Sequence, residues 1–324
     1  MALRVCSGVF FPQGLSTALK RIPIPIRAAS YMAIAAVLFV SMHTIVRGMS
    51  GELHPFEIAF FRAFLGLFVL APLVIRHRGL SLRTRNLKLH VLRGLLNAGA
   101  MLSFFYGLSI TPLAQATALG FSVPLFATVL AVFFLGEVVG IKRWTAIAIG
   151  FLGTLVILRP GVIEVGIGPL LIIASSAIWS FALMVIKVMT RTDTSVTISL
   201  YASIFLSPIV FAAALPFWEM PTIGQFTRMF VLAALGTLAQ TLMNQSLKIA
   251  DTSVVLPVDF TKLIWATLLG YLFFEEIPDI FTWFGGAMIF GSTTYIAVRE
   301  ARLRRKTELP ASVDQPGTPS DKPG

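Results

Sequence analysis

A carboxylate and an amine lie inside one of the most apolar stretches of this chain. The stretch from Thr252 to Phe274 reads TSVVLPVDFTKLIWATLLGYLFF and carries Asp259 and Lys262 near its middle. Opposite charges three residues apart share a helix face and can neutralise each other. Each charge costs at least ~2.5–3.5 kcal/mol at the centre of a bilayer. The pair therefore indicates either a structural ion pair that holds two helices together or a polar site inside a membrane protein.

The composition is that of a polytopic membrane protein. Of the 324 residues, 56% are hydrophobic and only 13% are charged, and the mean hydropathy is +0.84. Soluble domains are about 25% charged. The single cysteine, Cys6, excludes an internal disulfide and a cysteine-rich metal site. The net charge of +11 comes from basic residues in predicted loops and tails, where they set membrane orientation, so we expect no nucleic-acid partner.

Apolar runs long enough to cross a bilayer recur along the chain. About 20 residues are needed per span. The sequence predicts an all-α protein with ten transmembrane helices, between an N-terminal tail (1–28) and a basic, then disordered, C-terminal tail (299–324). The expected spans are 29–47, 56–75, 89–110, 113–135, 142–158, 168–187, 194–217, 226–247, 252–274 and 280–298.

The distribution of Lys and Arg predicts the orientation. Basic residues gather in both tails and in every second connection, whereas the alternate connections carry most of the acidic residues, including the run Glu275-Glu276-Ile277-Pro278-Asp279. Basic connections stay in the cytoplasm. Both termini are therefore expected to be cytoplasmic.

The chain repeats itself at an offset of about 139 residues. The run FATVLAVFFLGE, which ends at Glu137, matches WATLLGYLFFEE, which ends at Glu276, and Trp144 matches Trp283. Five spans per repeat place the two halves in opposite orientations, so we expect an inverted repeat of residues 29–160 and 161–298. Such repeats are typical of secondary transporters, which alternate access to a site between their halves.

Further polar and aromatic side chains inside the expected spans are candidates for binding a substrate. Gln240, Thr241 and Asn244 form a polar stripe at helical spacing, and such a stripe favours a cavity. Asn97, Trp179 and Phe121 complete the candidate set. The alternative for hydroxyl groups is a bond to their own backbone or to a neighbouring helix, and the alternative for Trp179 is core filling.

Four other residues are candidates for gating or for structural roles. Pro124 and Pro257 fall inside the fourth and ninth spans, where proline kinks a helix and frees a carbonyl. Arg62 is expected to be structural and paired with Glu57. Arg93 lies about one turn inside the third span, on the face of Asn97, and could extend its charge to the membrane surface.

The same features resemble a known family. Two five-span halves, the run HPFEIAFFRAFLG from His54 to Gly66, the run FATVLAVFFLGE, and LVILRPG from Leu155 to Gly161 are similar to the EamA family of the drug/metabolite transporter superfamily. The resemblance covers about residues 30–298. It implies a carrier of small metabolites in the bacterial inner membrane, with a site between the two halves. The stretch PVDFTKL is similar to a subgroup that includes riboflavin importers and S-adenosylmethionine uptake carriers.

Together these observations favour a secondary transporter of a polar, ring-containing metabolite. Riboflavin is the single best candidate, and S-adenosylmethionine uptake or export of amino acids or other metabolites remains open. A non-transporting membrane enzyme or assembly factor is the alternative from another class, but the expected spans hold no acid, base or nucleophile cluster. No phosphate-binding loop, zinc protease motif or serine hydrolase motif occurs, so we expect no enzyme activity and no cofactor. The expected partners are a small-molecule substrate and the lipid bilayer, and a homodimer is left open.

Overall fold

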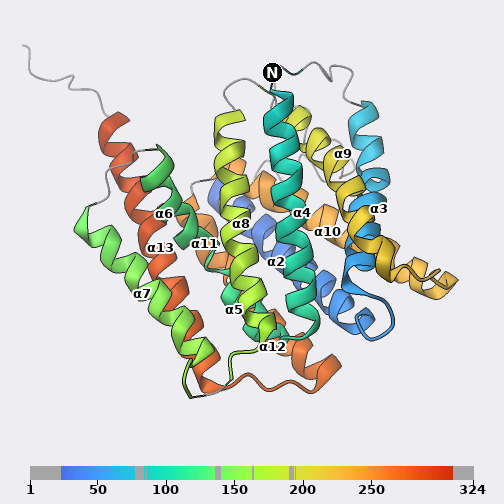
Figure 1. The fold of residues 1–324 in the computed structure, drawn as a ribbon. Coiled ribbons are helices and arrows are strands. Elements are labelled where there is room, and N and C mark those ends of the chain that lie inside the picture. The colour runs from blue at the N-terminus through green and yellow to red at the C-terminus, as the bar shows by residue number, and fades with distance from the viewer. Residues whose placement is uncertain are drawn as a thin grey trace, which may run out of the picture.

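The computed structural model is a bundle of long helices (Figure 1). It describes residues 23–76, 84, 86–135, 140–162, 164–189, 193, 195–250 and 252–308. The helices in chain order are α2 (Ile24–Met49), α3 (Pro55–Arg76), α4 (Leu87–Ser109), α5 (Leu113–Gly120), α6 (Val123–Leu135), α7 (Ile141–Leu158), α8 (Ile167–Met189), α9 (Ser195–Ala214) with the short 3₁₀ turn η2 (Leu215–Phe217), α10 (Ile223–Ile249), α11 (Thr252–Asp259), α12 (Thr261–Phe274) and α13 (Ile280–Glu308).

The expected all-α membrane architecture is confirmed. Within the described residues, six segments are long and apolar enough to cross a membrane: α2, α4, α5 with most of α6, α7, most of α8 and most of α10. The other four expected spans are helical as well. Helix α3 carries three charged residues. Most of α9 and η2 form a shorter apolar helix, α13 is rich in Gly, Ser and Thr, and the ninth span is divided into α11 and α12.

The fourth and ninth spans are both interrupted, and at equivalent positions. The break between α5 and α6 begins at Phe121, and α11 and α12 are separated by Phe260, which lies 139 positions later. The two prolines do not mark the breaks themselves. Pro124 lies in the first turn of α6, where its missing N–H is harmless, whereas Pro257 lies inside α11, two residues before that helix ends.

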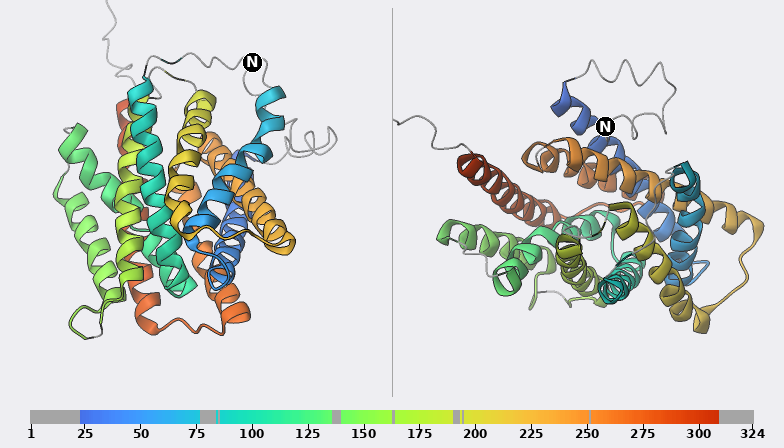
Figure 2. Two further views of the ribbon diagram at one scale, coloured as in Figure 1. Left: turned by 45° about the vertical axis from the view of Figure 1, so that its right-hand side comes forward. Right: turned by 90° about the horizontal axis from the view of Figure 1, so that it is seen from above.

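The contacts between helices follow a two-fold pattern that exchanges the halves. Helix α2 packs on α10, and its counterpart α8 packs on α4; α12 packs on α2, and its counterpart α6 packs on α8. Helices α7 and α13, which are counterparts, lie side by side at one edge of the bundle, and α3 and α9 lie at the opposite edge (Figures 1 and 2). The packing therefore agrees with the inverted repeat.

The burial pattern fixes the register of the first helix of each half. Buried positions on α2 recur 140 positions later on α8, for example Met32 and Ile172, or Met49 and Met189. In this register Phe39 is the equivalent of Trp179. We call the end of the bundle that carries residues 50–54, 159–162, 164–166, 215–222 and 275–279 the acidic end, and the opposite end the basic end.

Close helix packing at the edge of the bundle depends on glycine. A Cβ on Gly153 of α7 would lie 2.7 Å from the backbone oxygen of Gly285 and 2.8 Å from the Cβ of Met288, both on α13. In lipid, small residues allow such close approach, and van der Waals contact drives much of the helix association.

We predict that Gly153→Ala separates α7 from α13 and lowers the free energy of unfolding by about 1–3 kcal/mol, because overpacking of this size has that cost. Thermal unfolding of the purified protein in detergent measures the effect. Gly291→Ala on α13 is the matched control, because a Cβ at Gly291 meets nothing within 4 Å. Equal melting temperatures for the two variants would contradict this packing.

Candidate binding site between the two halves

The Asp259 and Lys262 side chains form an ion pair across the break in the ninth span. The Lys262 Nζ lies 2.5 Å from the Asp259 Oδ1, and each side chain is 16% exposed. Asp259 is the last residue of α11 and Lys262 is the second residue of α12. The two charges therefore lie on opposite sides of the break at Phe260. Backbone groups at helix ends lack hydrogen-bond partners within their own helix.

Aromatic rings surround this ion pair. The Lys262 Nζ lies 4.8 Å from the centre of the Phe39 ring on α2, a distance at which a cation is attracted to the ring face. Phe260 stacks on Phe290 of α13 at 4.1 Å. Phe121, at the equivalent break in the first half, lies 5.4 Å from Phe260 between ring centres. The two breaks therefore meet through their equivalent phenylalanines.

The first half has no charge at the equivalent place. Gly120 and Val123 occupy the positions that correspond to Asp259 and Lys262. The Ser180 hydroxyl of α8 donates to the Val123 carbonyl oxygen at 2.8 Å. A neutral hydrogen bond thus joins α8 to α6, where the second half has a lysine over an aromatic ring.

The polar stripe on α10 is satisfied largely within its own helix. The Gln240 Nε2 donates to the Asn244 Oδ1 at 3.1 Å, and the Thr241 hydroxyl donates to the Thr237 carbonyl oxygen at 2.8 Å. Asn244 is exposed, and Gln240 and Thr241 are half-buried. The structure therefore places the stripe on one face, as the spacing predicts, and leaves its role in binding a prediction.

The remaining candidates lie on α3, α4 and α8. Asn97 and Arg93 are each 8% exposed on α4, so both side chains are buried in the bundle, and the roles expected for them stay predictions. The Asn97 Oδ1 has no hydrogen-bond partner among the described residues. Trp179 is half-buried on α8.

The expected pairing of Arg62 with Glu57 is wrong. The Arg62 Nη1 donates to the Met101 Sδ at 3.4 Å, and the Glu57 Oε2 instead accepts the backbone N–H of Glu219 at 3.4 Å. Glu57 is two residues into α3 and next to the η2 connection, whereas Arg62 lies more than a turn deeper. The two side chains therefore lie at different depths of the bundle and bind different partners.

A second charged cluster, which the sequence patterns did not single out, closes the acidic end. Arg47 at the end of α2 forms an ion pair with Glu276 and donates to the carbonyl oxygens of Leu108, at 3.1 Å, and Thr111. The Glu276 Oε2 accepts the N–H of Leu113, the first residue of α5, at 2.8 Å. A carboxylate at a helix N-terminus is stabilised by the helix dipole. We call Arg47, Glu276, Thr111 and Leu113 the acidic-end clamp.

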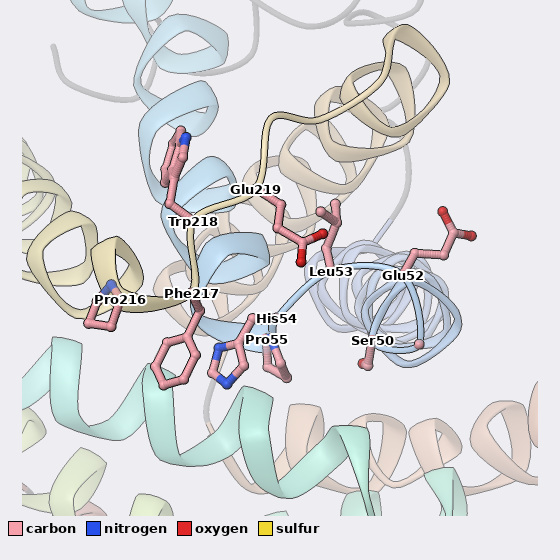
Figure 3. A pocket seen from close by; sticks show the side chains of 10 residues that line it. Ser50, Glu52, Leu53, His54, Pro55, Pro216, Phe217, Trp218 and Glu219 are labelled. Atoms are coloured by element: carbon pink, nitrogen blue, oxygen red, sulfur yellow. The ribbon is translucent and has the colours of Figure 1, made fainter.

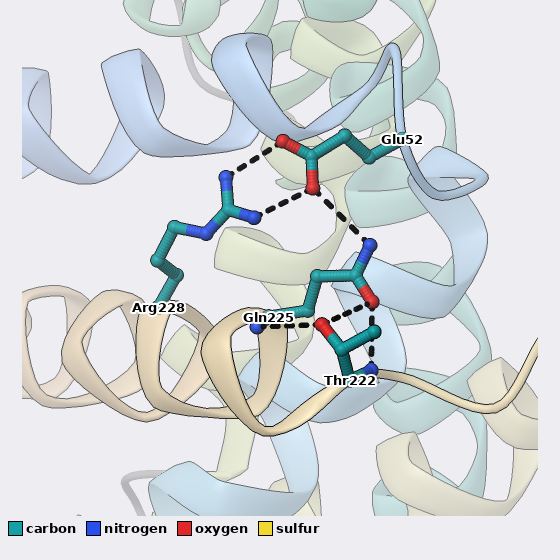
Figure 4. A network of polar contacts seen from close by, with 4 residues as sticks. All are labelled: Glu52, Thr222, Gln225 and Arg228. Carbon is teal, nitrogen blue, oxygen red and sulfur yellow. Dashed lines mark hydrogen bonds and ion pairs between the residues drawn. The ribbon is translucent and has the colours of Figure 1, made fainter.

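An exposed network joins the same end of the bundle between α2 and α10. Arg228 and Gln225 both bind the Glu52 carboxylate, and Gln225 also caps α10 with Thr222 (Figure 4). The hydrogen bonds from Arg228 lower the pKa of Glu52. The pair therefore stays charged at neutral pH and weakens only as the pH falls through this lowered pKa.

A pocket of the described structure lies away from the ion pair. A pocket of about 540 Å³ lies at the acidic end between residues 50–55 and 216–219, where the His54 ring stacks on Phe217 at 3.8 Å (Figure 3). Partial burial lowers the pKa of His54, so this imidazole is neutral at pH 7. The pocket is a wide surface feature whose lining residue Glu52 is already paired with Arg228, and we assign it no role in substrate binding.

Two inverted halves that meet at interrupted helices, with charges at the meeting point, are an arrangement typical of transporters. The chain matches the EamA-like transporter family over residues 26–159 and 166–298 and belongs to that family. It is a multi-pass membrane transporter of a small molecule and not an enzyme.

Named relatives include carriers of S-adenosylmethionine and carriers of riboflavin. The chain is 33% identical over 257 residues to an S-adenosylmethionine uptake transporter of Rickettsia bellii, covering 79% of this chain and 88% of the relative. It is 32% identical over 282 residues to a riboflavin transporter of Rhizobium johnstonii, covering 86% and 93% of the two chains. A protein crystal structure with 22% sequence identity aligns with a TM-score of 0.57 over 84% of this chain and 98% of the other, and it supports the fold alone.

We predict that Asp259→Asn and Lys262→Met each reduce transport at least about tenfold, because each leaves one buried charge without its partner. Transport by the double variant distinguishes the two interpretations of the pair. Loss of transport in the double variant indicates that the charges contact substrate, and recovery indicates a structural pair. Abundance in the membrane and elution as a single folded species are the controls. Normal transport by both single variants would contradict a role for the pair.

Proposed function

We propose that this protein takes up S-adenosylmethionine by alternating access at the crossing of its two interrupted helices. The observation that carries the proposal is the Asp259–Lys262 ion pair beside Phe39 and Phe260. S-adenosylmethionine has an ammonium group, a sulfonium group and a carboxylate. An ion pair that opens offers one partner for each sign of charge, and phenylalanine faces attract a sulfonium or stack on adenine. The relatives named for this substrate support the assignment.

Riboflavin is the second candidate, and it is favoured by a different observation. The facing rings of Phe121 and Phe260 suit a flat isoalloxazine, and the amides of Gln240 and Asn97 can bind its polar edge. Riboflavin carries no charge near neutral pH and leaves the ion pair unused. We therefore place it after S-adenosylmethionine.

In the proposed transport cycle, the acidic-end clamp keeps the acidic end of the bundle closed in this conformation. Arg47 belongs to the first half and Glu276 to the second, and we propose that this contact breaks when the acidic end opens. Because the halves are inverted, an exchange of their conformations would open one end of the bundle while closing the other. We further propose that the basic end faces the cytoplasm of a bacterial cell and that the protein lies in the inner membrane. A homodimer stays a prediction.

Uptake of radiolabelled compounds into a bacterial host without its own carriers tests the substrate. We expect saturable uptake of S-adenosylmethionine that is absent from cells with an empty vector and strongly reduced by Asp259→Asn. Riboflavin uptake and rescue of a riboflavin-requiring strain are measured in parallel. Uptake of riboflavin without uptake of S-adenosylmethionine would reverse the order of the two candidates.

A covalent link across the acidic-end clamp should stop transport. Gly48 lies next to Phe274, since a Cβ on this glycine would be 3.9 Å from the tip of the Phe274 ring. In a Cys6→Ser background, we predict that Gly48→Cys with Phe274→Cys loses uptake when a short reducible bifunctional reagent joins the two thiols, and regains it on reduction.

The two single-cysteine variants, treated with the same reagent, control for modification alone. Full uptake by a completely cross-linked protein would show that the acidic end does not open during transport.

A further inference from the structure

Arg62 holds a charge in the bundle for which the described part of the chain supplies no counter-charge. Its recorded contact is the Met101 sulfur, at 3.4 Å from Nη1, and no carboxylate of the described residues lies within 4 Å of the guanidinium, since all of their ion pairs involve other cations. A thioether is a weak acceptor, whereas a guanidinium presents five N–H donors. Most of these donors are therefore available to an acceptor that is not part of the described protein.

The neighbours of Arg62 leave space for its guanidinium and connect it to the ion pair. A Cβ at Gly236 of α10 would lie 3.5 Å from the Arg62 Nε and 3.7 Å from Nη2, so the absence of a side chain at Gly236 lets the guanidinium lie along α10. On α2, the His43 ring lies 6.4 Å from the Phe39 ring that Lys262 contacts, and the preceding residue, Met42, lies beside Gly236 as Arg62 does. The His43 ring also lies 5.0 Å from the Phe104 ring of α4. Residues of α2, α3, α4, α10 and α12 thus converge here.

The charges at this convergence do not balance. Arg62 and Lys262 contribute two positive charges, and Asp259, paired with Lys262, contributes one negative charge. Arg62 is half-buried, and a charge inside a membrane protein without a counter-charge is costly and indicates a functional site. A planar guanidinium with free donors matches a carboxylate, which it binds with two parallel hydrogen bonds.

We propose that Arg62 is the carboxylate-binding subsite of the transport site and that the substrate class is a compound with an α-amino carboxylate group. The subsite rests on the proposed function and sharpens it. The carboxylate binds Arg62, and the cationic groups of the same molecule face Asp259 and the Phe39 ring. S-adenosylmethionine has this pattern of charges and neutral riboflavin does not.

Binding of three compounds to the purified full-length protein tests the subsite. The probes are S-adenosylmethionine, its decarboxylated form, which keeps the adenosine, sulfonium and amine, and riboflavin. We expect the wild-type protein to bind S-adenosylmethionine about 10- to 100-fold more tightly than the decarboxylated form, the usual effect of hydrogen bonds to a charged group. Arg62→Met should remove this ratio, and Arg62→Lys, which keeps the charge without the planar fork, should retain part of it.

Arg228→Met is the matched control, since Arg228 pairs with Glu52 at the acidic end, and it should keep the wild-type ratio. Equal affinities of the wild-type protein for the two sulfonium compounds, or an unchanged ratio in Arg62→Met, would overturn the subsite.

Uptake into proteoliposomes shows whether the carboxylate subsite alone is wrong or the proposed function is wrong as well. If both sulfonium compounds are transported with equal KM, the subsite is wrong and the uptake proposal stands. If S-adenosylmethionine is neither bound nor transported, both are wrong. If Arg62→Met does not fold, the result depends on the wild-type ratio and on Arg62→Lys.

Discussion

The need to neutralise charge inside a membrane governs the organisation of this protein. Asp259 and Lys262 satisfy it with each other across a helix break, and Phe39 covers the ammonium group. The break places the two charges at the ends of two short helices instead of on the surface of one continuous helix. Arg62 has no carboxylate partner among the described residues, and this missing counter-charge is the observation from which we infer the substrate class.

The helix packing follows a two-fold pattern, whereas the charged residues at the helix breaks lie only in the second half. Both halves interrupt their fourth helix at the same position, and Phe121 and Phe260 bring the two interruptions into contact. The charges lie only in the second half, since Gly120 and Val123 stand in the equivalent places of the first. Two similar halves can exchange conformations while a single charged site holds the substrate, which is the arrangement that alternating access requires. The acidic-end clamp joins the halves at one end and gives that exchange a contact to break.

The sequence predicts those features that depend on local pattern. Apolar runs and the offset of about 139 residues predicted the helices and the inverted repeat, and the spacing of Asp259 and Lys262 predicted their pairing. Contacts between distant helices were beyond this reasoning. Arg62 was assigned to Glu57 because both lie on one helix, yet its neighbours come from α4 and α10. The pairing of Arg47 with Glu276 depends on how the halves pack, which no local pattern shows. The equivalence of Phe39 to Trp179 follows from the burial pattern of the structure and not from the sequence repeat alone.

A structure of the protein with S-adenosylmethionine, determined by electron cryo-microscopy, tests the central claim most directly. The account predicts ligand density between the Phe121–Phe260 crossing and Arg62, with the carboxylate on the guanidinium and a cationic group toward Asp259. Density confined to the pocket formed by residues 50–55 and 216–219, with the Asp259–Lys262 pair undisturbed, would contradict it.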